Sequence, residues 1–353
     1  MAKNLKFWLM SLLFVMTGSL SVFLYFLNTP TIIPNGVVFY LKPGTSKKVL
    51  AAELTQQHLI HHSYLFTMYL YLYSFITNHN HLKTGEYYFR IGSTPISIIK
   101  QITKGTGHYY RVFTIIPGST FQQLRQDLSR NQYFYHVVSE LNDQKIMDRL
   151  GASQFLPEGN FFPDTYYYTR GNSDFVILKH AYQLMQFHLN QAWINRAPSL
   201  PFKNPYELLI AASLIEKEAY LQTEKPLIAG VLVNRLRNNM LLQFDPTIIY
   251  GLGNRYRGKI YQSDLMDNNS YNTYLHKGLP PTPISLPNQS SLLAASHPMS
   301  HAYFYFVAKG DGSHQFSSSL TEHNKAVSLS NKASASYFNN DKIVTYLRGL
   351  FSS

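Results

Sequence analysis

The pattern of apolar and polar positions begins with one uninterrupted apolar segment. Residues 7–27, FWLMSLLFVMTGSLSVFLYFL, carry no charge. Their length suits a transmembrane helix, which needs about 20 residues to cross a bilayer. The polar sequence NTP follows directly, where a cleavable signal would have a small-residue cleavage site. The segment is therefore predicted to be an uncleaved transmembrane anchor.

The distribution of positive charge predicts how this anchor is oriented. Lys3 and Lys6 precede the apolar segment, and the next positive residue is Lys42. Positive charge is retained on the cytoplasmic side of membranes, so residues 1–6 are predicted to be cytoplasmic and the rest of the chain extracytoplasmic. We expect a single-pass membrane protein with a large extracytoplasmic body. A second apolar stretch, residues 64–76, is too short to span and is predicted to be a buried amphipathic helix.

A short pattern recurs three times after this anchor, starting at Gly44, Gly92 and Gly118. Each copy has the glycine, two hydroxyl residues, and aliphatic residues six and ten positions after the glycine. The pattern predicts a turn, a Ser or Thr N-cap and a helix with an apolar stripe. In the first two copies an extended run precedes the turn. Two interpretations remain open: three independently capped helices, or a small carbohydrate-binding module containing the first two.

The remaining pattern mixes helices and strands without a regular alternation. A strand is predicted at 109–117 and a β-hairpin at 302–317, around the turn sequence GDG. Helices are predicted near 120–130, 139–150, 174–195, 206–220 and 225–239, followed by an irregular stretch to about residue 290. The expected class is α+β. The predicted division is a cytoplasmic N-terminus (1–6), an anchor (7–27), a linker (28–37), a small module (38–109) and a larger domain (110–353).

Composition narrows the function. The 353 residues are 45% apolar and 14% charged, which excludes a disordered chain. The chain has a net charge of +12, 27 Tyr, 23 Phe and no Cys, so thiol catalysis is excluded. A basic, aromatic-rich chain suits an anionic membrane surface or a polysaccharide, and no nucleic-acid motif is present, so no nucleic-acid partner is predicted. The histidines lack HExxH spacing and no Walker or Rossmann pattern occurs, so neither a metal nor a cofactor is predicted.

Two glutamates stand close together in AASLIEKEAYL (211–221). On a helix beginning at Pro205 with Asn204 as its N-cap, Glu218 falls on the stripe of Leu214 and Ile215. Glu216 lies about 200° away around the axis. An apolar environment raises the pKa of a carboxyl group, which then holds a proton to donate near neutral pH.

The residues alone leave other roles open for these carboxylates. Glu218 could simply pair with Lys217 or Lys225 at the helix end. Asp245 and Asp164 each neighbour a proline in a predicted loop, where Asp commonly forms a local turn hydrogen bond. A glycosidase with two carboxylates would need a partner at a defined distance, and the sequence does not identify one.

Blocks of sequence then suggest a family. ASLIEKEAYLQTEKPLIAGVLVNRLRNNMLLQFDPTIIYGLG (212–253) resembles the signature of the endolytic murein transglycosylases, the MltG/YceG-like family. The resemblance continues through YNTYLHKGLPPTPISLP, SLLAASHP and YFVAKGDGSHQFSSSLTEHNKAV, and upstream through LKPGTS, LKTGEYYF and PEGNFFPDTY. Two departures are Ala219–Tyr220, where Thr or a small residue is frequent, and Phe244, where Thr is common. Either could alter the lining of a substrate groove.

The resemblance implies a peptidoglycan lytic transglycosylase that cleaves the MurNAc–GlcNAc β-1,4 bond of nascent glycan strands and leaves 1,6-anhydroMurNAc ends. It assigns the catalytic role to Glu218, with Glu216 in support, and makes residues 38–109 a LysM-like module. Implied partners are glycan strands and glycan polymerases of wall synthesis. The implied location is the bacterial inner (cytoplasmic) membrane, with the catalytic body on the periplasmic or outer side. Candidates for holding the sugar chain and steadying Glu218 are Gln243, Asp245, Tyr271, Asn272 and Tyr274; loop-fixing hydrogen bonds are the alternative for each.

Two rival functions remain. One is a muramidase in which Asp245 or another Asp positions a water molecule. The other is a non-catalytic glycan-binding scaffold of the wall-synthesis machinery.

Overall fold

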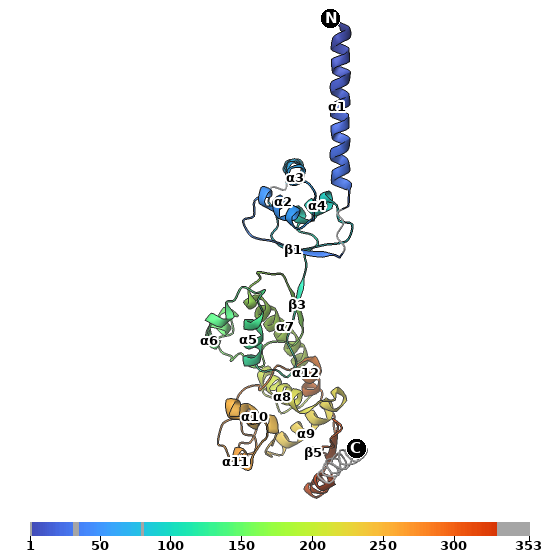
Figure 1. Cartoon of the computed structure of the whole chain (residues 1–353). Coiled ribbons are helices and arrows are strands. Elements are labelled where there is room, and N and C mark those ends of the chain that lie inside the picture. The colour runs from blue at the N-terminus through green and yellow to red at the C-terminus, as the bar shows by residue number, and fades with distance from the viewer. Residues whose placement is uncertain (1, 31–34, 79–80, 330–353) are drawn as a thin grey trace, which may run out of the picture. The chain divides into compact units, whose positions relative to one another are not determined.

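The computed structural model describes residues 2–30, 35–78 and 81–329 (Figure 1). The chain forms two compact units, residues 1–113 with 167–172, and residues 114–166 with 173–353. The boundary passes through β3 (Arg111–Thr114) and β4 (Thr165–Tyr168), which pair with each other, whereas the predicted division was linear. Residues 31–34 of the predicted linker and 330–353 of the predicted larger domain lie outside the described residues. The predicted α+β class is confirmed.

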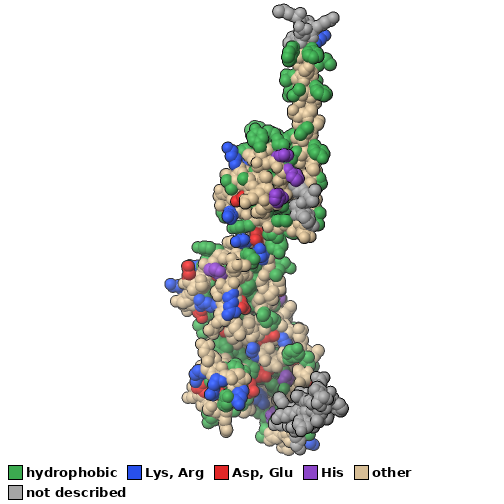
Figure 2. Space-filling view, viewed as in Figure 1, with side chains coloured by type: hydrophobic (Ala, Val, Ile, Leu, Met, Phe, Trp, Pro, Cys, Tyr) green, Lys and Arg blue, Asp and Glu red, His purple; other side chains and the backbone are tan. Residues whose placement is uncertain are grey.

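The first unit begins with α1 (Ala2–Asn28). Residues Lys6–Asn28 of this helix are long and apolar enough to cross a membrane, and the protein buries none of the most apolar stretch. Figure 2 shows the hydrophobic side chains that project along it. Only the last turn is enclosed: Phe26 and Leu27 belong to the core of the first unit.

A two-stranded antiparallel sheet and three helices form the rest of this unit. β1 (Val37–Leu41) pairs with β2 (Gly85–Phe89), so that Val37 lies opposite Phe89 and Leu41 opposite Gly85. The helices are α2 (Lys47–Gln56), α3 (Ser63–Thr77) and α4 (Pro95–Lys104). Phe39 and Leu41 alternate inward along β1, as a strand with one buried face requires.

Each copy of the recurring glycine pattern forms a turn followed by a capped helix, as predicted. Ser46, Thr94 and Thr120 are the N-caps of α2, α4 and α5 (Phe121–Arg130), and each side chain accepts a hydrogen bond from the backbone N–H three residues later. Gly44, Gly92 and Gly118 have φ of 79°, 79° and 76°, a left-handed conformation that glycine adopts without strain.

Helix α3 departs from its prediction. The stretch is helical, but only Phe66, Leu70 and Ser74 are buried. The opposite side of the helix is apolar and exposed to solvent, with Phe75 and Ile76 at 85% and 70% exposure. A wholly apolar helix of this length has more apolar surface than one small core can cover, so the predicted burial is correct for one face only.

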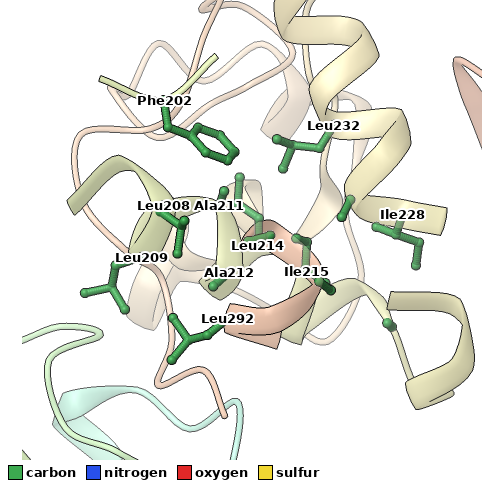
Figure 3. Packing of buried hydrophobic residues seen from close by; sticks show 14 of the residues in the cluster. Phe202, Leu208, Leu209, Ala211, Ala212, Leu214, Ile215, Ile228, Leu232 and Leu292 are labelled. Atoms are coloured by element: carbon green, nitrogen blue, oxygen red, sulfur yellow. The ribbon is translucent and has the colours of Figure 1, made fainter. Parts of the chain in front are cut away.

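The second unit is mainly helical, and α8 (Pro205–Glu218) runs through its core (Figure 3). Residues 208–215 are all buried, so α8 is enclosed on every side along that stretch. Phe202, Ile228, Leu232 and Leu292 are among the side chains packed around it. The other elements are η1 (Val138–Glu140), α6 (Asp143–Arg149), α7 (Asp174–Ile194), η2 (Gln222–Glu224), α9 (Lys225–Arg237), α10 (Asp245–Leu252), η3 (Gly253–Arg255), α11 (Gln262–Leu265) and α12 (Gln289–Ser296).

Helices α10 and α11 contradict the predicted irregular stretch. Proline and glycine interrupt this part of the chain at short intervals, so each helix is too short to show a clear period. The predicted hairpin is present: β5 (Tyr305–Ala308) pairs antiparallel with β6 (His314–Ser317).

Candidate active site

The two glutamates occupy the last turn of the central helix. Asn204 caps α8, its Oδ1 accepting from Glu207 N at 3.0 Å, and Pro205 is the first helical residue, as predicted. The helix ends at Glu218, and Ala219 is its C-cap. Because the core holds α8 on all sides, the carboxylates project from a rigid support.

Glu216 is bound within the fold. Its carboxylate pairs with Lys225 Nζ at 3.2 Å, and the two side chains are 8% and 3% exposed. Its Oε2 also accepts from Asn288 N at 3.0 Å and Ser291 Oγ at 2.7 Å, at the start of α12. Lys225 therefore pairs with Glu216 rather than Glu218, and Lys217 Nζ donates to Gly118 O. Glu216 joins α8, α9 and α12.

Glu218 has a different environment. Its side chain is half-buried, and within the described ranges its carboxylate makes no hydrogen bond or ion pair. The pKa of Glu218 is raised from 4.5 to about 8, chiefly by burial and then by the negative charge of Asp245, while the positive charge of Arg235 acts in the opposite direction. The group is thus a carboxylic acid at neutral pH, with a proton to donate and no internal partner to hold it. Since both glutamates are partly buried, their hydrogen-bond partners distinguish them better than the predicted apolar stripe does.

Asp245 and Tyr274 form a pair beside Glu218. Asp245 is the first residue of α10 rather than a loop residue, and its carboxylate is exposed. The Tyr274 hydroxyl donates to Asp245 Oδ1, and burial and this hydrogen bond both raise the pKa of Tyr274. The structure therefore brings together three of the predicted site residues: Glu218, Asp245 and Tyr274.

Arg235 completes this group and was not predicted. It lies on α9 and is 6% exposed. Its Nε donates to Phe304 O at 2.6 Å, and its Nη1 donates to Leu242 O. The guanidinium thus joins the hairpin to the loop before Asp245 and supplies positive charge near Glu218. The only signal in the sequence was the position of Arg235 within the block 212–253 that resembles the family signature.

The other predicted residues have mixed surroundings. Gln243 is exposed, with φ of 53°, and its N–H donates to Thr273 O at 3.0 Å. Tyr271 is half-buried and its hydroxyl lies 2.9 Å from Thr282 Oγ1. Asn272 is fully buried; its amide donates to Leu265 O and Asp267 O, and its Oδ1 accepts from Tyr274 N. The contacts of Asn272 are those of a residue that fixes a loop, so it supports Tyr274 through the backbone.

The two departures from the family pattern have separate consequences. Phe244 is 1% exposed and packs against Phe306 of the hairpin, with ring centroids 5.9 Å apart. It adds to the core rather than lining a groove. Ala219 is also buried, whereas Tyr220 is 84% exposed and free to contact a ligand.

Glu158 is a second buried acid, which the sequence analysis did not select. It lies in the block PEGNFFPDTY. Its carboxylate accepts from Phe121 N at 3.0 Å and from the Tyr250 hydroxyl at 3.2 Å, and burial raises its pKa to about 7. The ring of Tyr250 contacts that of Tyr271, with centroids 4.8 Å apart. Glu158 is thus linked to Tyr271 through the ring of Tyr250, although the hydrogen bonds of its carboxylate are made to groups within the protein.

A cavity of about 470 Å³ lies away from these carboxylates, between the hairpin and the chain that follows it. Its lining includes Val307, Phe316, Glu322 and Leu329, and none of the predicted site residues. We therefore assign the site from its chemistry. A half-buried carboxyl group with a raised pKa, held at the end of a core helix, makes Glu218 the candidate for a general acid–base residue.

The chain belongs to the YceG-like family, whose model matches residues 39–329. A relative from Bacillus subtilis, named endolytic murein transglycosylase, is 29% identical over 302 residues, which cover 80% of this chain and 81% of the relative. A Streptococcus pneumoniae protein of the same name is 25% identical over 80% of this chain and 56% of its own length. The crystal structure of a YceG-like protein from Listeria monocytogenes has a TM-score of 0.52 at 26% identity, covering 82% of this chain and 98% of that one. The predicted family is confirmed.

Proposed function

We propose that this protein is a lytic transglycosylase that cleaves peptidoglycan glycan strands internally, with Glu218 as its general acid and base. The observation that carries the proposal is the Glu218 carboxyl, whose pKa is raised to about 8 and which has no internal partner among the described residues. The relatives named endolytic murein transglycosylases support the substrate and the reaction class.

The proposed reaction needs one protein carboxyl group. Protonated Glu218 donates its proton to the oxygen of the MurNAc–GlcNAc β-1,4 bond, and that bond breaks at C1 of MurNAc. The Glu218 carboxylate then takes the proton of the C6 hydroxyl of the same MurNAc, whose oxygen bonds to C1. The product end is 1,6-anhydroMurNAc, Glu218 is again protonated, and no water is consumed. Since the nucleophile belongs to the substrate, its proximity replaces a second catalytic carboxylate.

The residues around Glu218 are proposed to bind the glycan. The Asp245 carboxylate and the Gln243 amide are exposed and offer hydrogen bonds to sugar hydroxyls. The Tyr274 hydroxyl is hydrogen-bonded to Asp245. Tyr274 and Tyr271 offer aromatic faces of the kind on which sugars stack. Glu216 acts by holding α8 against α9 and α12, and Asn272 by fixing the loop that carries Tyr274.

The rest of the chain would bring this site to nascent strands. We propose that α1 is an uncleaved anchor in the bacterial cytoplasmic membrane, with the chain after it outside, and that the sheet and helices of residues 38–109 act as a LysM-like glycan-binding module. Glycan polymerases of wall synthesis are the expected partners, because their product emerges at the same membrane face. The length and apolar surface of Lys6–Asn28 support the anchor.

Activity should fall as pH rises through about 8. Glu218 acts first as an acid, so the reactive form is the protonated one, present below its pKa and lost above it. Asp245→Asn removes a negative charge that raises this pKa, and we expect the alkaline limb of kcat/KM to move to lower pH while turnover persists. The exposed Asp127→Asn on α5 is the control and should leave the limb in place.

The same pair of variants tests the rival muramidase. If Asp245 were the carboxylate that positions water, Asp245→Asn would abolish turnover at every pH instead of shifting the profile. That outcome would replace the proposed mechanism with a hydrolytic one.

A further inference from the structure

One face of α3 is apolar, exposed and continuous. Its side chains recur at the spacing of a single helical face, and α3 contains no charged residue. The large exposed side chains, with their exposed fractions, are Tyr64 (78%), Met68 (43%), Tyr71 (52%), Leu72 (46%), Phe75 (85%) and Ile76 (70%). A surface of this kind on a soluble domain marks a site of interaction.

Helix α3 contacts the membrane-spanning candidate directly. The ring of Tyr69 lies 6.0 Å from that of Phe23, and the ring of His62, the N-cap of α3, lies 5.6 Å from that of Phe26. Leu27 is 1% exposed within the same core. The end of α1 is therefore embedded in the core of the unit that carries the α3 face.

These contacts define the depth of α3 if α1 spans a bilayer. The 23 residues from Lys6 to Asn28 extend about 35 Å at 1.5 Å per residue, a little more than the roughly 30 Å of hydrocarbon. Phe23 lies five residues before the helix end, about 7.5 Å from it. That distance places Phe23, and Tyr69 beside it, near the boundary between hydrocarbon and headgroups.

Two ring contacts place α3 at the level of the last turns of α1. Going from His62 to Tyr69 along α3 leads from Phe26 back to Phe23 on α1, which is toward the bilayer. Phe75 and Ile76 are the most exposed aromatic and aliphatic side chains of the second half of α3. In Figure 2 hydrophobic side chains cover the part of this unit next to α1.

We propose that α3 is an interfacial membrane helix, whose Tyr64–Ile76 face enters the outer leaflet of the bilayer that α1 spans. This inference rests on the proposed anchoring by α1. Tyrosine and phenylalanine are suited to the boundary between acyl chains and headgroups. Residues 35–113 contain eight Lys or Arg and two acidic residues, a balance that favours anionic lipid headgroups. Docking would hold the first unit against the membrane and fix its orientation there.

Single-cysteine labelling tests this inference cleanly, because the chain has no cysteine. The full-length protein is reconstituted in vesicles of phosphatidylethanolamine and phosphatidylglycerol, with an environment-sensitive fluorophore on Phe75→Cys. Acyl-chain-brominated lipid is the quencher. Leu13→Cys, 62% exposed on α1, reports insertion of the anchor, and Val112→Cys, 56% exposed on β3, is the control. We expect quenching at positions 75 and 13 and none at 112.

The outcomes separate the two proposals. Quenching at 13 without quenching at 75 overturns the docking of α3 and leaves the anchor intact, whereas no quenching at either position overturns both. A blue shift at 75 that depends on protein density and not on brominated lipid means that a second copy covers the face, which also overturns the inference.

A substitution test uses the same vesicles. In Tyr64→Cys protein, Phe75→Glu with Ile76→Glu should remove lipid quenching at position 64, because two carboxylates oppose entry into the leaflet. Ile91→Glu, 69% exposed before α4, should leave that quenching unchanged. Retained quenching in the double variant contradicts the inference.

Discussion

Glu218→Gln should lower the rate of glycan cleavage by about 10²–10⁴-fold, the usual contribution of a general acid–base group. The amide has nearly the same shape but neither gives up a proton to the glycosidic oxygen nor takes one from the C6 hydroxyl. The carboxyl makes no internal hydrogen bond among the described residues, so the substitution should not destabilise the fold. The measurement is the rate of muropeptide release from purified sacculi, together with binding of the same sacculi.

Glu207→Gln is the matched control, since it makes the same chemical change in the first turn of the same helix. Glu207 Oε2 accepts from Lys203 N at 2.7 Å, a bond that the glutamine oxygen can replace. We expect near-wild-type rates for this variant. If Glu218→Gln releases products at the wild-type rate, Glu218 is not the acid. If neither protein releases products while both bind sacculi, the chain is a glycan-binding scaffold.

Glu216→Ala should cost about 3–5 kcal/mol of unfolding free energy, the range for breaking a buried ion pair by removing one partner. Lys225, 3% exposed, would keep its charge without a counter-ion, and Asn288 N and Ser291 Oγ would lose their acceptor. Urea unfolding followed by the fluorescence of Trp193, which packs against the α8 core, measures this loss. Trp8→Phe removes the other tryptophan.

A double variant separates lost charge pairing from lost packing. Glu216→Met with Lys225→Met replaces both ions by apolar side chains of similar length, and such replacements are often close to neutral. We expect it to recover much of the stability lost in Glu216→Ala. A single variant within about 1 kcal/mol of wild type would contradict a structural role for Glu216, because removal of a charge from a buried pair costs more than that.

Local signals in the sequence predicted the elements that form locally. The glycine and hydroxyl pattern at Gly44, Gly92 and Gly118 identified three capped helices, because a cap bonds within its own first turn. The GDG turn identified the terminal hairpin. Helix α10 was missed, since eight residues beginning Asp-Pro have no readable period. The exposed face of α3 was missed because a uniformly apolar helix does not reveal which side the core covers.

The site was only partly predictable, for a similar reason. Helical spacing and the family resemblance both selected Glu218, but its raised pKa depends first on its burial in the folded protein and then on Asp245, 27 residues away on another helix. The hydrogen bond between Tyr274 and Asp245 joins residues 29 positions apart in the sequence. The hydrogen bond from Ser291 to Glu216 joins residues 75 positions apart. Such pairings arise from packing. Arg235 and Glu158 were overlooked because neither has a motif spacing that signals chemistry by itself.

The central claim is that one carboxyl group suffices because the substrate supplies the nucleophile. The most direct test is the mass of the muropeptides released by the wild-type protein in water labelled with heavy oxygen. The account predicts 1,6-anhydroMurNAc ends, lighter by one water than a hydrolysed end and free of the label. Reducing MurNAc ends that carry the heavy oxygen would show that water is the nucleophile and would contradict it.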